Sequence, residues 1–381
     1  MKTAWLALLT CAPGPCVADN LIRDLGRTPQ SEVAAACERK DWVACRELGE
    51  RAQYGKGVPQ DLAAARRLYE QARTYGDTSA SSYLKRLELD ARCAALGATV
   101  SEPGTIKDVE VCAVDYYAAK AEGKGAFEDA VACARRVQQA ETLAMLYANG
   151  HGVPRDLDRA IRAACEYRDV SAERDGMLEA LFSMKEAEDD APFDFCAFAT
   201  SGHTAYRCSA YAAGALGAAD DALLDAARAA WSPAALAEWQ KLEPIADAFF
   251  EAEASAQTYE DRLGTAHLAL YEDALTGMRH AFVEKVASAS AFDPTQADGA
   301  KLDEWDRELN AVYARSLKAA EDDGGRDAIR AAERAWIRYR DAAAAFFAAV
   351  RAGHHPPPAT AQAVRARLTR ERVEQLKKAM N

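Results

Sequence analysis

Six histidines are the first side chains to consider for catalysis or metal binding. They are His151, His203, His267, His280, His354 and His355. His151 lies in a glycine-rich turn and His354-His355 in a proline-rich loop, where solvent exposure explains them more simply than metal ligation. Ser201-Gly202-His203 lacks the strand–turn–helix setting of a hydrolase nucleophile. The sequence therefore predicts no catalytic residue, no metal site and no cofactor.

Clustered charges are the next candidates. The acidic pairs are Asp189-Asp190, Asp220-Asp221 and Asp322-Asp323. They flank predicted helices and turns, so helix caps and solvated linkers explain them better than a general acid and base. Arg334, Arg338 and Arg340 share a helix face, which could bind an acidic partner or form a surface of salt bridges. No glycine-rich phosphate loop follows a strand, because no strand is predicted.

Cysteines are the third kind of reactive side chain. Removal of a leader would leave eight of the ten: Cys37, Cys45, Cys93, Cys112, Cys133, Cys165, Cys196 and Cys208. There is no C-x-x-C and no histidine at ligand spacing, so disulfides formed in an oxidising compartment are favoured over zinc. Possible pairs are Cys196 with Cys208, Cys93 with Cys112, and Cys133 with Cys165. Sequence alone leaves the connectivity open.

The N-terminus supports export. Residues 1–18 have the pattern of a signal peptide, with Lys2, a short apolar core and small residues before Asp19. The mature protein would then be periplasmic or secreted. Leu8-Leu9-Thr10-Cys11 offers an alternative, a lipid anchor on Cys11. No other stretch approaches the roughly 20 apolar residues of a membrane span.

Composition narrows the class of partner. The net charge of −12 argues against a nucleic-acid surface, which needs clustered lysine and arginine, and suits a cationic protein partner. Half of the 381 residues are hydrophobic, alanine is abundant, and proline is sparse inside long segments, which favours helices throughout. A chain of this length is expected to hold two or three domains.

One sequence motif occurs twice in the first half of the chain. Residues 48–66 and 143–161 both carry G-x-G-V-P, a polar residue and Asp-Leu. The turn glycines are Gly55, Gly57, Gly150 and Gly152. Glycine there ends a helix in the left-handed conformation, and the following aspartate, Asp61 or Asp156, caps the next helix. Each copy is therefore an αα-hairpin, which must stack on a neighbour to bury its apolar stripe.

These residues resemble SEL-type repeats, relatives of tetratricopeptide repeats. The matching positions are Leu48, Gly49, Gly55, Gly57, Val58, Asp61, Ala65 and Tyr69, then Leu143, Tyr147, Gly150, Gly152, Val153, Asp156 and Ala160. The resemblance implies a short helical solenoid, assigned to residues 19–190, that binds other proteins. Cysteine-rich SEL-type proteins carry the C-x7-C spacing as a disulfide, and this implies a Cys37–Cys45 bond.

The last third predicts three helices, one marked by Leu302 to Leu317, one over about 326–350 and one over about 361–380. HHPPP at 354–358 separates the second from the third. This region resembles the LprI-like domain, named for a lysozyme inhibitor and widespread in exported bacterial proteins. The motif that carries the resemblance is ERAWIRYRD, with Trp336, Arg338, Arg340 and Asp341. The family usually has cysteines around these helices, whereas this chain has none after Cys208.

Residues 191–291 are interpreted as a degenerate copy of the same unit, ahead of the LprI-like domain at 297–381. The predicted fold is all-α, with a short αα-hairpin solenoid followed by one or two LprI-like helical units. The predicted function is a non-enzymatic, exported protein-binding module whose partner is a lysozyme or an envelope protein. The alternative is a scaffold or assembly adaptor of the cell envelope that uses the repeat surface.

Overall fold

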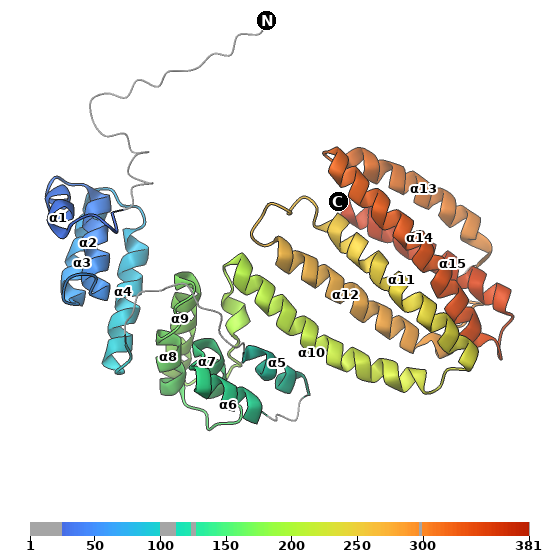
Figure 1. The fold of residues 1–381 in the computed structure, drawn as a ribbon, viewed down its shortest axis with the longest axis horizontal. Coiled ribbons are helices and arrows are strands. Elements are labelled where there is room, and N and C mark those ends of the chain that lie inside the picture. Colours follow the sequence, from blue (N-terminus) through green and yellow to red (C-terminus); the bar gives the residue numbers. More distant parts are fainter. Residues whose placement is uncertain (1–24, 100–111, 123–126, 297–298, 381) are drawn as a thin grey trace, which may run out of the picture. The chain divides into compact units, whose positions relative to one another are not determined.

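The computed structural model describes residues 25–99, 112–122, 127–296 and 299–380. The predicted signal peptide and the possible lipid site at Cys11 lie outside this range. The described residues form fifteen α-helices, three short 3-10 helices and no strand, so the all-α prediction is confirmed. The chain divides into two compact units, one of residues 1–110 and 134–198 and the other of residues 111–133 and 199–381 (Figure 1).

The helices of the first unit pair as hairpins. They are α1 (Gln30–Glu38), α2 (Trp42–Tyr54), α3 (Leu62–Thr74), α4 (Ala80–Ala95), α7 (Ala140–Asn149), α8 (Leu157–Cys165) and α9 (Ser171–Ala187), with η1 (Phe195–Phe198) after them. The helix α6 (Glu128–Val137) crosses the boundary between the units. The pairs α2 with α3 and α7 with α8 pack extensively, as the repeat pattern predicts.

The two hairpin turns have the same geometry. Gly55 and Gly150 end α2 and α7 with φ of 71° and 69°, a conformation that L side chains rarely adopt. Asp61 then accepts from the Ala64 amide at 2.8 Å, and Asp156 accepts from the Arg159 amide at 3.0 Å. Gly57 and Gly152 also have positive φ.

Side chains at equivalent positions brace both turns. Gln60 Nε2 donates to the Gln53 carbonyl at 2.7 Å, and Arg155 Nε donates to the Ala148 carbonyl at 2.9 Å. The residue type differs, but the carbonyl that is satisfied is the same one in each copy. The turn therefore depends on a long donor at this position and not on one particular side chain.

The two hairpins differ where their helices cross. In the first, Tyr69 is fully buried against Gly49, and a Cβ on Gly49 would lie 2.5 Å from the ring. In the second, Ala144 and Ala164 stand at the corresponding places, both fully buried. A glycine opposite a tyrosine thus fills the space that two alanines fill in the other copy.

Disulfides join the helices of the first unit in an order that the sequence did not predict. Cys37 bonds Cys45 between α1 and α2, as the resemblance implied. Cys93 bonds Cys165, however, which corrects the possible pairs Cys93–Cys112 and Cys133–Cys165. The reason is that α4 packs on α8, which brings together two cysteines 72 residues apart.

The other four cysteines within the described ranges are also oxidised. Cys112 bonds Cys133, because α5 (Ala113–Glu122) is followed closely by α6. Cys196 and Cys208 are disulfide-bonded as well. No free cysteine occurs among the residues that the structure describes.

The second unit is built on two long central helices. Its helices besides α5 are α10 (Gly202–Arg228), α11 (Pro233–Gln257), α12 (His267–Ala287), α13 (Leu302–Ala319), α14 (Asp323–Arg351) and α15 (Pro357–Ala379), with η2 (Ala289–Ala291) and η3 (Gly299–Lys301) between them. Helices α11 and α14 lie side by side over much of their length (Figure 1). Helix α11 continues through Pro244, a proline in its interior.

One hydrophobic core runs through α10 to α15. Aromatic rings dominate it: Trp239 stacks on Phe282 at 5.7 Å and packs edge-on against Phe346 at 5.8 Å, and Phe249 stacks on Tyr339 at 5.2 Å. These contacts join α11, α12 and α14. Helices α13 and α15 join this core through aliphatic residues, including Leu309, Val312, Leu368 and Val373. The three cysteine-free helices α13 to α15 are therefore held by apolar packing without a disulfide of their own.

The predicted C-terminal helices are present with small shifts at their ends. The HHPPP segment separates α14 from α15, but its last two prolines occupy the first turn of α15. Proline is tolerated there because the first amides of a helix have no partner within the helix.

Candidate functional site

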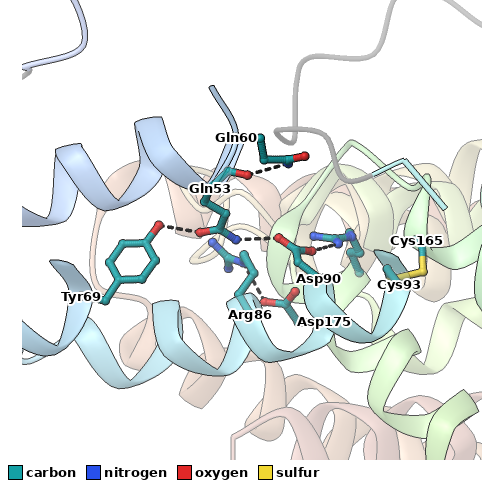
Figure 2. Close-up of polar contacts among 9 residues, drawn as sticks. Gln53, Gln60, Tyr69, Arg86, Asp90, Cys93, Cys165 and Asp175 are labelled. Carbon is teal, nitrogen blue, oxygen red and sulfur yellow. Dashed lines mark hydrogen bonds and ion pairs between the residues drawn. A yellow bond between two sulfur atoms is a disulfide. The ribbon is translucent and has the colours of Figure 1, made fainter. Parts of the chain in front are cut away.

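A buried polar network occupies the first unit. The Tyr69 hydroxyl donates to Gln53 Oε1 at 2.5 Å, and Gln53 Nε2 donates to Asp90 Oδ2 at 2.6 Å (Figure 2). The other oxygen of Asp90 accepts from Arg174 Nη2. Gln53 and Asp90 are fully buried, and the Arg174 side chain is 1 % exposed. The chain of bonds links the first hairpin through α4 to α9.

A second ion pair accompanies this network. Arg86 Nε donates to Asp175 at 2.9 Å, next to the Arg174–Asp90 pair (Figure 2). Burial raises the pKa of Asp175, and the neighbouring Arg86 only partly opposes that rise. Burial also raises the pKa of Tyr69 and of Tyr54. Because helices enclose these groups, we interpret the network as structural: it holds the first hairpin, α4 and α9 together.

The motif of the C-terminal unit is divided between core and surface. Trp336 is only 3 % exposed and packs in the core, and the guanidinium of Arg340 lies 5.2 Å from the centroid of its ring. Arg340 pairs with Asp306 on α13 at 3.1 Å, and Asp341 pairs with Arg365 on α15 at 3.0 Å. Three of the four motif residues therefore fasten α14 to its neighbours.

Arg338 is the exception. It is exposed, and it makes no ion pair or hydrogen bond within the described part of the chain. The basic face suggested by the sequence is thus partly neutralised, through Arg340, and partly free, through Arg338. Only the free part is available to a partner.

A buried ion cluster lies beneath the motif. Arg372 on α15 pairs with Glu253 on α11 at 2.9 Å and with Glu333 on α14 at 3.1 Å, and its side chain is 1 % exposed. Gln375 donates to Glu253 at 2.8 Å and accepts from Arg372 at 2.8 Å. One guanidinium thus faces two carboxylates in the core.

The excess of carboxylate has an electrostatic consequence. Burial raises the pKa of Glu333, with the charge of Arg372 opposing that rise, since the neutral form needs less solvation. The sequence analysis assigned no role to Glu333, the first residue of the ERAWIRYRD motif, or to Arg372. The available signal was their spacing: Glu333 lies three residues before Trp336, and Arg372 lies between Leu368 and Leu376, so both charges fall on apolar faces.

A cavity of about 400 Å³ opens over this cluster. Its walls combine apolar residues, including Ile329, Leu376 and Met380, with carboxylates at the rim, including Glu260 and Glu321. Arg372 and Glu253 also line it. It is formed by the C-terminal ends of α11, α13 and α15 and the N-terminal end of α14. Such a mixture suits part of a partner protein bearing positive charge.

The other residues considered in the sequence have structural roles. Asp322 caps α14 by accepting from the Gly325 amide at 2.8 Å. Asp220 contacts His280 Nδ1 at 2.8 Å, a pair that the sequence did not predict, and this contact raises the pKa of His280. No group of three or more potential metal ligands occurs within the described ranges. None of the described helices is both long and apolar enough to cross a bilayer.

The predicted copy at 191–291 can be compared with α11 directly. Aligning this copy with the Trp336 helix puts Leu242 at the position of Trp336 and Asp247 at that of Asp341. Leu242 is fully buried, and Asp247 pairs with Arg279 on α12 at 3.2 Å. Asp341 likewise pairs with an arginine on the following helix, α15. The duplication remains a prediction that these parallels support.

Fold and site together define an all-helical protein of repeat hairpins and a helical unit. Comparison with known families agrees: residues 42–74 and 143–162 match the Sel1 repeat, and residues 285–376 match Lysozyme inhibitor LprI. Both resemblances drawn from the sequence are thereby confirmed. No curated protein and no solved structure matches the chain significantly.

These domains set the class of protein. Repeat and inhibitor modules are binding modules, so the combination is that of a binding or inhibitor protein. Several disulfides together with an inhibitor domain are typical of an extracytoplasmic location.

Proposed function

We propose that this protein is a non-enzymatic, exported protein that binds and inhibits a lysozyme through its C-terminal helical unit. The observation that carries the proposal is the LprI match over residues 285–376, which covers α13, α14 and most of α15. The net charge of −12 favours association with a cationic enzyme.

The missing cysteines do not weaken the unit. The Arg372–Glu253–Glu333 cluster connects α11, α14 and α15. The Arg340–Asp306 pair adds α13, and the Asp341–Arg365 pair gives a second link between α14 and α15. A binding surface on these helices is therefore held in a fixed shape, which reduces the entropy lost on binding.

Lysozyme inhibition gives the test. The full-length oxidised protein is added at increasing molar ratio to hen egg-white lysozyme, and the clearing of a bacterial cell-wall suspension is followed. We expect dose-dependent inhibition and a measurable complex by calorimetry. Full enzyme activity at a large molar excess of the protein would contradict the proposal.

Charge alone must be separated from recognition. An unrelated acidic protein of similar net charge, assayed at low and high salt, is the control, because non-specific attraction is screened by salt. Inhibition by the full-length protein should persist at salt concentrations that abolish any effect of the control.

A scaffold role through the repeats is the second candidate. Its supporting observation is a half-buried stack on the first hairpin, where Arg46 lies 5.0 Å from the Trp42 ring centroid and 5.5 Å from that of Tyr83. Tryptophan, tyrosine and arginine are the residues that most often dominate binding at protein interfaces. An envelope protein recovered by the wild type and lost with Trp42→Ala would support this role.

Export itself is also proposed, to the periplasm or beyond the cell, with a lipid anchor at Cys11 as the alternative. The support is the oxidised state of the described cysteines. Intact mass of protein from its native envelope distinguishes the cases. A chain beginning at Asp19 supports cleavage, added lipid mass at Cys11 supports the anchor, and eight free thiols on a chain with Met1 would contradict export.

A further inference from the structure

The loop between α11 and α12, residues 258–266, presents an unusual side chain. Leu263 is 91 % exposed, more than any other large hydrophobic residue in the described part of the chain. Leu268 and Leu270, just beyond the loop, are 58 % and 40 % exposed. Leu268 and Leu270 lie two residues apart on α12 and so face different sides of that helix, which leaves Leu263 as the exposed apolar side chain of the loop itself.

The loop is held in place from one side by α14. Asp322 accepts from Arg262 at 3.1 Å and is hydrogen-bonded to the Tyr259 hydroxyl. The Arg262 guanidinium also stacks 3.8 Å from the Tyr259 ring centroid. A Cβ on Gly324 would overlap with the Tyr259 hydroxyl, so glycine permits this close approach.

The N-terminal end of α10 fixes the loop from another side. A Cβ on Gly202 would overlap with the Thr265 carbonyl, so the two backbones touch. Within the loop, the Gly264 amide donates to the Asp261 carbonyl at 2.7 Å. Leu263 is therefore carried at the tip of a braced loop, and little entropy would be lost if it were buried by a partner.

Negative charge surrounds this leucine. Glu260 and Asp261 precede it in the loop, and Glu321 lies with Glu260 on the rim of the 400 Å³ cavity. All three are exposed, and none of them makes an ion pair with another described residue. The charge of Arg262 is already matched by Asp322. The surroundings of Leu263 are therefore acidic.

We infer that loop 258–266 is the docking element of the second unit, and that Leu263 inserts into an apolar recess edged by basic groups on a partner protein. The inference rests on the proposed function and makes a lysozyme the partner. The acidic surroundings disfavour a second copy of this chain and an anionic lipid surface, both of which would bring like charges together. The loop precedes the 285–376 match, so the match itself does not point to it.

The test measures binding of full-length oxidised variants to immobilised hen egg-white lysozyme. Leu263→Ser should weaken binding by about ten- to a hundredfold, the effect of losing one buried leucine side chain. Leu223→Ser is the matched control, since Leu223 is 43 % exposed on α10 in the same unit, and it should bind like the wild type. Glu260→Lys with Asp261→Lys should mainly slow association and flatten its dependence on salt.

The outcomes separate the two proposals. No binding by the wild type would overturn both the lysozyme function and the docking loop. Wild-type affinity in Leu263→Ser would overturn the loop alone and leave the function standing. Equal losses in Leu263→Ser and Leu223→Ser would also overturn it, and so would a wild-type dimer that Leu263→Ser dissociates.

Discussion

At the scale of single residues, the first hairpin depends on a glycine that makes room for a ring. Gly49 permits Tyr69 to reach Gln53, and through it the network that ends at Arg174. The space between α2 and α3 is thus coupled to a hydrogen bond that no alanine pair provides. A change at Gly49 acts on both.

Gly49→Ala should therefore destabilise the first unit by about 1–3 kcal/mol, because the added methyl group must displace the Tyr69 ring. Urea unfolding followed by circular dichroism measures the loss. The same substitution should cost less in a Tyr69→Ala background, where the space resembles that of the second hairpin. Gly214→Ala, at a helical glycine with open space around it, should be neutral or stabilising.

Glu333 makes stability depend on pH. Its pKa is raised in the folded protein above the ordinary value of 4.5, so the folded state holds a proton over a pH range in which the unfolded chain has lost it. This contribution to stability is complete below about pH 4.5 and is lost as the pH rises through the raised value.

Glu333→Gln removes that titration and keeps an oxygen for Arg372. The free energy of unfolding of the variant, minus that of the wild type, should increase from about pH 5 to about pH 7.5. Denaturant unfolding at both values measures it. A difference that stays constant or decreases would show that Glu333 titrates at or below its ordinary pKa.

At the scale of helices, a disulfide in the first unit and a buried ion cluster in the second each hold neighbouring helices together. Cys93–Cys165 holds α4 to α8, whereas Arg372 holds α11, α14 and α15 together without covalent bonds. The loops closed by the disulfides differ greatly, with sequence separations of 72 residues for Cys93–Cys165 and 8 for Cys37–Cys45.

Removal of the disulfide that closes the longer loop should therefore lower the free energy of unfolding by more. The chain-entropy relation gives about 4 kcal/mol for replacing Cys93 and Cys165 by serine and about 2.5 kcal/mol for replacing Cys37 and Cys45. Thermal unfolding of the two double variants compares them. The reverse order would mean that native-state packing, and not loop closure, governs these bonds.

Helix positions followed from the sequence because each helix carries its own signals. The Gly55 and Gly150 turns, the Asp61 and Asp156 caps and the prolines before α15 are local features. Contacts between helices that are far apart in the sequence have no such local signal. Cys93–Cys165 required knowledge that α4 packs on α8, and Glu253 and Arg372 meet only because α11 and α15 both contact α14.

The docking loop escaped prediction for a similar reason. Leu263 in the sequence is one apolar residue among polar neighbours, and nothing local shows that Gly202 and Gly324 will brace it. Its exposure is a property of the assembled unit. The family resemblance, which depends on α13 to α15, gave no information about it.

At the scale of the whole molecule, each unit has its own hydrophobic core, and the disulfides are spread unequally, with Cys112–Cys133 in the second unit. Cys37–Cys45 and Cys93–Cys165 belong to the first unit, whereas helices α11 to α15 contain no cysteine. Reduction should consequently affect the units unequally.

Tryptophan fluorescence can report the unfolding of the second unit, because that unit contains Trp231, Trp239, Trp305 and Trp336. Addition of a reductant should shift a transition seen by circular dichroism to lower temperature while the main fluorescence transition changes little. A common shift of both signals would show that the two units unfold together. Trp42, the one tryptophan among the described residues of the first unit, can be replaced by phenylalanine to remove its contribution.

The nesting of Cys112–Cys133 within Cys93–Cys165 has a consequence for biosynthesis. Cysteines that were oxidised in the order in which they leave the ribosome or a translocon would join Cys93 to Cys112, and then Cys133 to Cys165. Both bonds would have to be exchanged by thiolate attack before the native set could form. If oxidation follows chain order, we therefore expect native pairing to depend on a disulfide isomerase, and a strong oxidant alone to leave misbonded forms.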